Sequence, residues 1–547
     1  MILDLFNLNK QQQNQLDKIY DENKDNLEKI FFNLINNDKK NFLVFSFLIS
    51  RNPEENNLYY KICVLKLIEY YAKKKILKKV IANDNIFKNY IQKNFKNINE
   101  EIKENNKILF VENFLKFLKN IFFLIKLYFF KSSKRKYNFI NKKKLILLDI
   151  FLIKSMFKNN YFVNRYYSNY LSKLNYEQKQ RLFFFPIFFN NSLSLKNIKI
   201  FSKNRNFILH TDFLSLFDLA KILFIFIKSH FYRAPKLSYK NLELKDLINY
   251  EIQAKSFNHS FLISILTYFV LKNLKKSGAN ISTFVDWFEN QIVDKSIFYS
   301  FSKFFPNTKL KAYMGLNADL SINNHLIPTR LEKKNNLTPN EIFLVNTDHK
   351  KYFKKVFGNK KIKIAPAFRN QTIYHYAKTK NRKTKNSKIL VVFTGSHLDN
   401  LKMIETLNSL SKKVCKNFYF ILRFHQNSEI RKLIPSINTK IKFKVSKYDS
   451  IYDLLCISRC VICRPSTISL EAAIFNVPVI LTRRIFNLMP IQVNSSMKKN
   501  LCYENSEVDK KLMKLPKKLR NKTFFNLKLA QKYFAKYNLN KTLNLIS

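Results

Sequence analysis

The sequence predicts two α/β domains, each built on a parallel β-sheet, that face each other across a cleft and follow a mostly helical N-terminal region. Short apolar segments alternate with helix-spaced segments over 145–375, and more clearly over 389–515. Such alternation is typical of parallel strands joined by helices, as in Rossmann-like domains. A polar, basic segment over 376–388 separates the two series and is the expected interdomain linker.

The N-terminal region, 1–144, has apolar residues at helical spacing in a polar background. Within it, the amphipathic segment 113–130 is followed by basic residues over 131–136. This pattern is typical of a helix that lies on an anionic membrane. A core helix followed by a solvated lysine run has the same pattern, and we favour this simpler interpretation.

In the first α/β series, the expected strands are short apolar runs that end in polar or small residues. They are the segments 145–153, 183–189, 282–288, 309–315, 341–348 and 361–368. The apolar run over 218–227 belongs to the same alternating series.

In the second series, strand and helix patterns take turns regularly. The expected strands are 388–395, 417–425, 440–446, 459–464 and a final strand over 477–481. One helix is expected through Leu398 to Cys415, another after an N-cap at Asp449 or Ser450, and a third through Glu471. These elements form a domain of about 130 residues, an ordinary size for a domain, and 516–547 is expected to be a helical tail.

The positive charge of the chain gives little information about its partners. Lys and Arg total 98 against 38 acidic residues, a formal net charge of +60, which ordinarily indicates nucleic acid or an anionic membrane. The chain is also poor in Gly and Trp and rich in Lys, Asn, Ile and Phe, as codon drift in an AT-rich genome produces. Because the aromatic residues are spread over the whole chain, we expect no nucleic-acid partner.

The six cysteines and the apolar runs favour a protein of the cytoplasm. Six cysteines in 547 residues do not indicate a secreted disulfide scaffold. Cys456, Cys460 and Cys463 lack a fourth ligand at zinc spacing, so we expect no metal site. The longest apolar runs fall short of the roughly 20 residues needed to cross a bilayer, and no transmembrane helix is expected.

Polar residues follow two strands of the second domain, where a parallel sheet collects its ligands. Arg423 and His425 share one face at the end of a strand. Ser466 and Thr467 open a helix, whose free N–H groups suit a phosphate, and Glu471 lies one turn further. Each also has a plain structural interpretation: a surface ion pair, a packed histidine, ordinary N-caps, or a capping box. Together they favour an anion site.

The segment SIYDLLCISRCVICRPSTISLEAAIFNVPVIL resembles the nucleotide-binding half of glycosyltransferases with the two-Rossmann GT-B fold. The Arg-x-His at Arg423 and His425 is similar to the His-Pro position of polysialyltransferase-like and teichoic-acid-polymerase-like enzymes, with Gln426 in place of the proline. The resemblance implies that His425, Ser466 and Thr467 hold the nucleotide phosphates and that Glu471 lies near the ribose or the donor sugar.

A second resemblance lies in the first domain. The segment Thr283 to Gly315 is similar to a bacterial family of surface carbohydrate biosynthesis proteins, in which a Trp-x-Glu-Asn-Gln element precedes a helix. Trp287, Glu289, Asn290 and Gln291 match that element, and we expect Trp287, Asn290 and Gln291 on the acceptor side. Glu289 is our candidate catalytic base, because the bulk of the tryptophan would raise its pKa. The alternative is that Glu289 only caps the next helix.

These features predict a metal-independent glycosyltransferase of surface polysaccharide biosynthesis (capsule or lipopolysaccharide) that needs no cofactor. Its expected partners are a nucleotide-sugar donor, with a CMP-linked acidic sugar as one candidate, and a lipid-linked or oligosaccharide acceptor. The expected location is the cytoplasm, with peripheral association at an anionic inner membrane. The alternatives are a sugar-nucleotide epimerase or polyol-phosphate transferase on the same fold, or a basic non-catalytic protein that binds nucleic acid or membrane.

Overall fold

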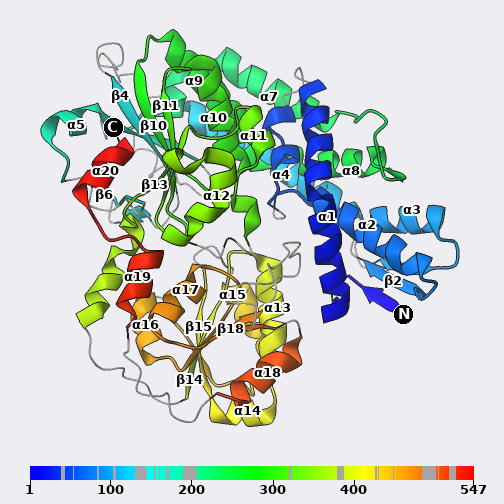
Figure 1. Ribbon diagram of the computed structural model, residues 1–547. Helices are drawn as coiled ribbons and strands as arrows, with labels where there is room; N and C mark the ends of the chain where they lie inside the picture. Colours follow the sequence, from blue (N-terminus) through cyan, green and yellow to red (C-terminus); the bar gives the residue numbers. More distant parts are fainter. Residues whose placement is uncertain are drawn as a thin grey trace.

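The computed structural model (Figure 1) places most of the chain. The described residues are 1–5, 7–37, 43–52, 55–82, 85–102, 106–129, 144–152, 156–158, 161–164, 166–167, 171, 173–188, 206–317, 320, 323–378, 387–425, 428, 430–446, 449–482, 500–502, 504–515 and 525–546. Gln426, most of the predicted linker (379–386) and the start of the predicted tail (516–524) lie outside them.

The first α/β domain contains a six-stranded, all-parallel sheet in the order β7-β4-β10-β11-β12-β13. Its strands are β4 (Leu145–Phe151), β7 (Leu182–Ile187), β10 (Ile281–Trp287), β11 (Lys309–Met314), β12 (Glu341–Leu344) and β13 (Ile362–Ile364). Every residue of β4 is buried, as expected for a strand covered on both faces. The helices of this domain are α5 (Tyr176–Arg181), α7 (Leu216–His230), α8 (Lys245–Lys255), α9 (His259–Lys276), α10 (Ile292–Phe304), α11 (Arg330–Lys334) and α12 (Lys350–Phe357). Two short hairpins, β5–β6 (Phe157–Lys158 and Tyr161–Phe162) and β8–β9 (Ser238–Tyr239 and Leu242–Glu243), complete it.

The second α/β domain has a parallel six-stranded sheet in the order β16-β15-β14-β17-β18-β19. Counted along the chain this is 3-2-1-4-5-6, the strand order of a Rossmann domain. The strands are β14 (Lys388–Val392), β15 (Tyr419–Arg423), β16 (Phe443–Val445), β17 (Cys460–Cys463), β18 (Val479–Thr482) and β19 (Leu501–Cys502). The helices are α13 (His397–Asn408), α14 (Lys412–Asn417), α15 (Ile430–Leu433), α16 (Ile451–Ile457), α17 (Thr467–Ile474) and α18 (Asn505–Met513).

The predicted fold class, two Rossmann-like domains facing a cleft after an N-terminal region, is confirmed. Two details of the second domain differ from the prediction. The single helix expected through Leu398 to Cys415 is two helices, because Ser411 caps α14 by accepting from the N–H of Val414. The strand over 477–481 is not the last, since β19 pairs with β18 beyond it. Ser450 is the N-cap of α16, as one of the two predicted alternatives has it.

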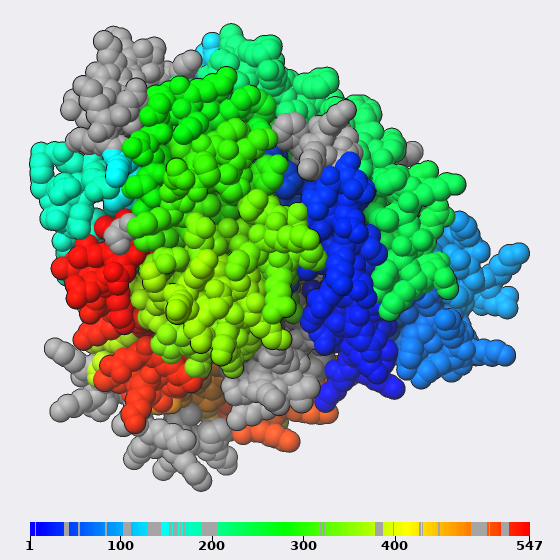
Figure 2. Space-filling view, turned by 45° about the horizontal axis from the view of Figure 1, so that its top comes forward, coloured from blue at the N-terminus to red at the C-terminus, as the bar shows by residue number. Residues whose placement is uncertain are grey.

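The N-terminal region is mostly helical but also carries a small parallel sheet that its sequence pattern does not indicate. Its helices are α1 (Lys10–Asn37), α2 (Leu58–Lys73), α3 (Asn85–Asn94) and α4 (Asn106–Phe129), and its strands are β1 (Ile2–Asp4), β2 (Lys79–Ala82) and β3 (Asn99–Ile102). With three or four residues each, these strands are too short for alternation to be recognised. Figure 2 shows this region, in blue, packed against the first α/β domain, in green.

A buried ionic cluster joins the N-terminal region to the first domain. Lys295 of α10 lies 2.7 Å from the carboxylate of Glu332, and both side chains are inaccessible to solvent. The guanidinium of Arg51 lies 3.7 Å from Glu332 and 3.7 Å from Glu28 of α1. Burial alone would raise the pKa of Glu332. The pKa is nevertheless lowered, because Lys295 and Arg51 stabilise the charged form of this side chain.

The last two helices connect the lobes. The 3₁₀ helix η10 (Phe368–Lys378) leads from the first domain towards the second, and α19 (Leu527–Tyr533) and α20 (Leu539–Ile546) return (Figure 1). Lys311 of β11 donates to the carbonyl of Asn544 at 2.8 Å, so α20 lies on the first domain. Among the described residues, no helix is long and apolar enough to span a bilayer.

Candidate functional site

A cleft of about 940 Å³ lies between the two α/β domains, a volume within the usual range of ligand sites. Most of the predicted site residues line it: Glu289 and Gln291 from the first domain, and Arg423, His425, Ser466, Thr467 and Glu471 from the second. Trp287 and Asn290 do not line it; both are buried behind it.

Strand order explains why these residues meet. In the second sheet the order reverses between β14 and β17, and a crevice forms beyond the carboxyl ends of such strands. The register pairs Val392 of β14 with both Arg423 of β15 and Cys463 of β17, so residues just beyond them share one edge. In the first sheet Trp287 pairs with Tyr313, so the residues two positions further, Glu289 and Gly315, also lie at one edge.

Arg423 and His425 lie at the end of β15. One guanidinium nitrogen of Arg423 donates to the carbonyl of Ser446 at 3.1 Å, which fixes the side chain at the edge of the cleft. His425 is exposed, and its imidazole passes close to Gly395, where a Cβ would lie 3.2 Å from Nδ1. A glycine at 395 therefore leaves the ring room to lie over the β14 loop.

Ser466 and Thr467 lie at the start of α17, and their hydroxyls are not used for capping. Ser466 is the N-cap by position, with φ −160°, but its side chain makes no capping hydrogen bond. Within the described part of the chain neither hydroxyl has a partner, and the backbone N–H groups of Thr467 and Ile468 have no acceptor. Two hydroxyls and two amides at a helix N-terminus are therefore available to an anion in the cleft.

Glu471 belongs to a hydrogen-bonded group that joins the two lobes. Its Oε1 accepts from Asn370 Nδ2 of η10 at 3.1 Å and from the Tyr452 hydroxyl of α16 at 3.2 Å. These bonds exclude the alternative that Glu471 completes a capping box with Ser466. Burial raises the pKa of Glu471 to about 7, although the nearby Arg369 guanidinium opposes the shift.

Glu289 is held by two side chains of its own loop. The indole Nε1 of Trp287 donates to Oε1 at 3.2 Å, and Nε2 of Gln291 donates to Oε2 at 2.8 Å. Burial raises the pKa of Glu289, but the hydrogen bond from Trp287 and the charge of Arg369 partly offset that rise, so the prediction that the tryptophan raises this pKa is wrong. A fixed, shielded carboxylate that faces a cleft is suited to accept a proton.

The turn after β10 orients Glu289, and a different carboxyl group caps the helix α10. Asn290 has φ +54°, a left-handed conformation that asparagine tolerates, and its amide donates to the carbonyl of His325 at 2.8 Å. The carboxylate that caps α10 is Asp294, which accepts from the backbone N–H groups of Glu289 at 2.9 Å and Gln291 at 3.0 Å. The Glu289 side chain is thus not the cap of α10.

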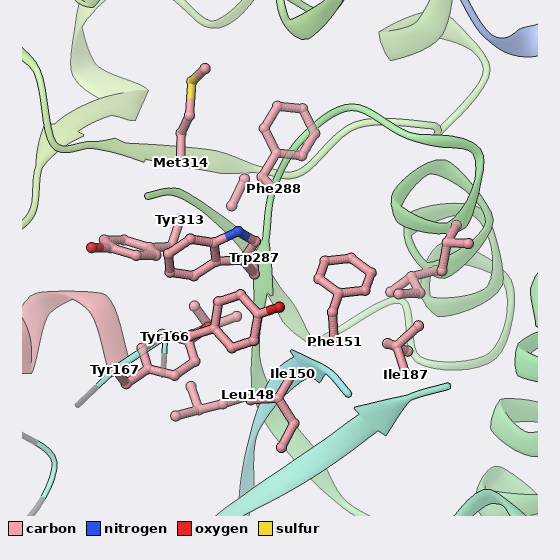
Figure 3. Packing of buried hydrophobic residues seen from close by; sticks show 14 of the residues in the cluster. Leu148, Ile150, Phe151, Tyr166, Tyr167, Ile187, Trp287, Phe288, Tyr313 and Met314 are labelled. Atoms are coloured by element: carbon pink, nitrogen blue, oxygen red, sulfur yellow. The ribbon is translucent and has the colours of Figure 1, made fainter. Parts of the chain in front are cut away.

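Trp287 forms the rear wall of this site (Figure 3). It is only 1% exposed, and the rings of Tyr166, Tyr167 and Tyr313 surround it at centroid distances of 4.5, 6.2 and 5.3 Å. Gly315 lies against its indole, where a Cβ would come within 2.2 Å of Cη2. Only a residue without a side chain fits at 315 while the indole keeps its bond to Glu289.

Three completely buried aspartates lie behind Glu289: Asp149 of β4, Asp286 of β10 and Asp294 of α10. Asp149 accepts a hydrogen bond from the backbone N–H of Trp287. Burial raises the pKa of Asp149 to about 8 and holds those of Asp286 and Asp294 well above the ordinary range. Burial therefore favours the neutral form of these three carboxyl groups.

The residue that sequence reasoning missed is Arg369, in the crossover η10. It lines the cleft with an exposed side chain, and its charge acts on both Glu289 and Glu471. A usable signal did exist at Gly315 and Gly395, which are two of only four glycines; one directly follows β11, the other lies three residues beyond β14, and both line the cleft. In a chain so poor in glycine, such positions mark close approaches of the backbone.

The basic side chains that line the cleft favour an anionic ligand such as a phosphate ester. They are Arg369, Arg423, Arg464, His325 and His425. Over the described ranges, no three His, Cys, Asp or Glu side chains are grouped so as to hold a metal ion.

No protein-family model and no curated protein matches the sequence. Among solved structures, MnaA from S. aureus in complex with UDP is 11% identical, with a TM-score of 0.39, and the match covers 74% of this chain and 98% of that one. The wall teichoic acid polymerase TagF is 12% identical, with a TM-score of 0.32 and coverage of 80% and 91%. The UDP-GlcNAc 2-epimerase from Neisseria meningitidis, bound to UDP-GlcNAc, is 13% identical, with a TM-score of 0.29 and coverage of 46% and 72%. At these identities and TM-scores, the likenesses do not bear on the function of this chain.

Proposed function

We propose that the protein is a glycosyltransferase that uses a nucleotide-activated sugar in the biosynthesis of a surface polysaccharide, capsule or lipopolysaccharide. The observation that carries this proposal is a pairing across one cleft. A shielded carboxylate, Glu289, faces an anion-binding edge that contains Arg423, His425, Ser466 and Thr467. Sugar transfer needs a base for the acceptor hydroxyl and positive charge for the departing phosphate, and the cleft offers both.

In the proposed reaction, the N-terminus of α17 and His425 bind the nucleotide phosphates, and Glu471 lies beside the ribose or the donor sugar. Glu289 takes the proton of the acceptor hydroxyl, and Gln291 contacts the acceptor. Trp287 and Asn290 support Glu289 from behind. We propose that neither a metal ion nor another cofactor takes part, because basic side chains and helix N–H groups can stabilise the leaving nucleotide.

The expected donor is a nucleotide sugar, with a CMP-linked acidic sugar as one candidate, and the expected acceptor is a lipid-linked or free oligosaccharide. Thermal shift measurements with CMP, UDP, GDP and CDP derivatives would identify the base. His425→Ala should weaken nucleotide binding about tenfold, because it removes a hydrogen-bond donor from the phosphate. Glu289→Gln should preserve binding and abolish transfer.

Nucleotide release, measured with and without an acceptor, separates the proposal from its alternatives. Release that depends on the acceptor supports the transferase. Conversion of the donor sugar without an acceptor indicates an epimerase, and consumption of CDP-polyols alone indicates a polyol-phosphate transferase. Steeply salt-dependent RNA binding with no effect of any nucleotide would refute the enzyme assignment. Full activity of Glu289→Gln would remove Glu289 from the base role.

A further inference from the structure

The first α/β domain carries an exposed apolar surface on two helices, α4 and α7, that the proposed reaction does not use. Phe217 and Phe224 of α7 and Phe231, the C-cap residue of this helix, recur every seven residues and are 65–66% exposed. A spacing of seven returns to nearly the same side of a helix, so the three rings form one stripe. Lys221 and Lys228 are exposed between them, and the Nζ of Lys221 lies 4.1 Å from the centre of the Phe217 ring.

The helix α4 repeats this arrangement. Its exposed apolar side chains recur at helical spacing and are 45–77% exposed: Val111, Phe114, Leu115, Phe122, Ile125 and Phe129. Lys116, Lys119 and Lys126 are exposed among them. The opposite side of α4 is buried through Phe123, Leu124 and Leu127.

The two helices lie next to each other on one underlying layer. Phe117 of α4 and Phe226 of α7 both pack on the ring of Phe257, at centroid distances of 4.8 and 5.4 Å. Asn120 of α4 also donates to the carbonyl of Phe257 at 2.9 Å. The two helices also contact each other directly, so their exposed apolar side chains lie on neighbouring helices. In Figure 1, α7 lies at the outer edge of the upper lobe, away from the cleft.

We infer that the outer face of α4 and α7 is a docking surface for an anionic lipid bilayer. Soluble domains rarely expose so many large apolar side chains together. Phenylalanine and leucine enter the boundary between headgroups and acyl chains, while lysines on the same face extend towards lipid phosphates. The acidic groups on these helices are few: Glu112 is paired with Lys116 at 3.6 Å, and Asp218 is bound by Ser215 at the start of α7.

Charge also explains why the partner is a bilayer rather than a second copy of the chain. In a two-fold symmetric dimer the same surface would meet itself, and the lysines of α4 and α7 would face identical lysines. An anionic bilayer offers apolar depth and negative charge together. The inference concerns a surface distant from the cleft and does not depend on the proposed reaction.

The test is flotation of the full-length protein with phosphatidylcholine vesicles, with and without phosphatidylglycerol. The native chain should float with the anionic vesicles and much less with the neutral ones. Phe217→Ser/Phe224→Ser should reduce binding to anionic vesicles about tenfold, because two aromatic rings can no longer insert into the bilayer. Phe122→Ser/Phe129→Ser should reduce vesicle binding by a similar factor. Because these side chains are exposed, both variants should have the same unfolding temperature as the native chain.

The matched control is Tyr176→Ser/Leu401→Ser, which removes exposed apolar side chains outside this surface and should leave vesicle binding unchanged. If all variants bind as the native chain does, binding arises from the general positive charge and the inference fails. If the native chain ignores vesicles but sediments as a dimer that Phe217→Ser/Phe224→Ser dissociates, the surface is a protein interface and the inference also fails. Nucleotide binding, measured on the same variants, should stay native in every case.

Discussion

Substitution of Gly315 by alanine should displace the only tryptophan of the chain, and with it the carboxylate proposed as the base. An added Cβ would lie 2.2, 2.6 and 2.7 Å from three atoms of the Trp287 indole, whereas carbon atoms in contact are about 3.5 Å apart. Either the strand end or the indole must therefore move by about 1 Å. The indole has little room, because the rings of Tyr166 and Tyr313 lie at 4.5 and 5.3 Å.

Overpacking of this kind costs about 1–3 kcal/mol of unfolding free energy. It should also lengthen the 3.2 Å bond from the indole Nε1 to Glu289, which fixes the carboxylate. A displacement of about 1 Å at a reacting group can reduce a rate about 100-fold. We therefore expect Gly315→Ala to lose transfer activity on that scale and to retain nucleotide binding, because the anion-binding edge belongs to the other domain.

Since Trp287 is the only tryptophan, its fluorescence reports on this site without knowledge of the substrate. In Gly315→Ala its emission should shift to the red and become more accessible to a quencher. Trp287→Phe frees space for the added methyl group. The double variant should therefore lose less unfolding free energy than the sum of the losses of the two single variants. Denaturant unfolding followed by circular dichroism measures these losses. Native fluorescence and native stability of Gly315→Ala would refute the packing explanation and, with it, the role of Trp287 in placing Glu289.

Two further predictions concern charge. Because burial raises the pKa of Glu471 from 4.5 to about 7, this carboxyl is neutral in mild acid and negative above pH 7, so calorimetry should show nucleotide binding weakening as the pH rises through that range. Glu471→Gln should remove that part of the pH dependence; a pH profile that stays flat in the native protein would mean that the charge of Glu471 does not act on the bound nucleotide. Lys295→Met leaves the buried carboxylate of Glu332 without its 2.7 Å partner, and denaturant titration should show a loss of about 3–5 kcal/mol. Lys295→Met/Glu332→Gln should recover part of this loss, and a native midpoint for Lys295→Met alone would mean that the ionic cluster does not anchor the N-terminal region.

The two-domain α/β architecture and one side of the cleft could be predicted from the sequence alone. Buried parallel strands such as Cys460–Cys463 leave a local signature, an unbroken apolar run followed by a polar turn, that survives codon drift. Arg423 ends such a strand, and His425, Ser466 and Thr467 lie two to four residues beyond one. Since carboxyl ends of parallel strands share one edge, strand assignment alone predicted that these residues would meet.

The other residues of the site are brought to it by contacts between distant parts of the chain. Asn370 lies 101 residues before Glu471 in the sequence, yet it donates to that carboxylate, and the charge of the neighbouring Arg369 acts on it too. The sequence predicted that Trp287 lies on the acceptor side, but the structure buries it as a support for Glu289. Its contact with Gly315 depends on the register of β10 and β11, which the sequence does not show. The pairing of Arg51 with Glu332 likewise spans most of the first domain. Sequence periodicity indicates which face of a helix or strand is buried. The residues that pack on that face come from distant segments of the chain, and a local sequence pattern does not identify them.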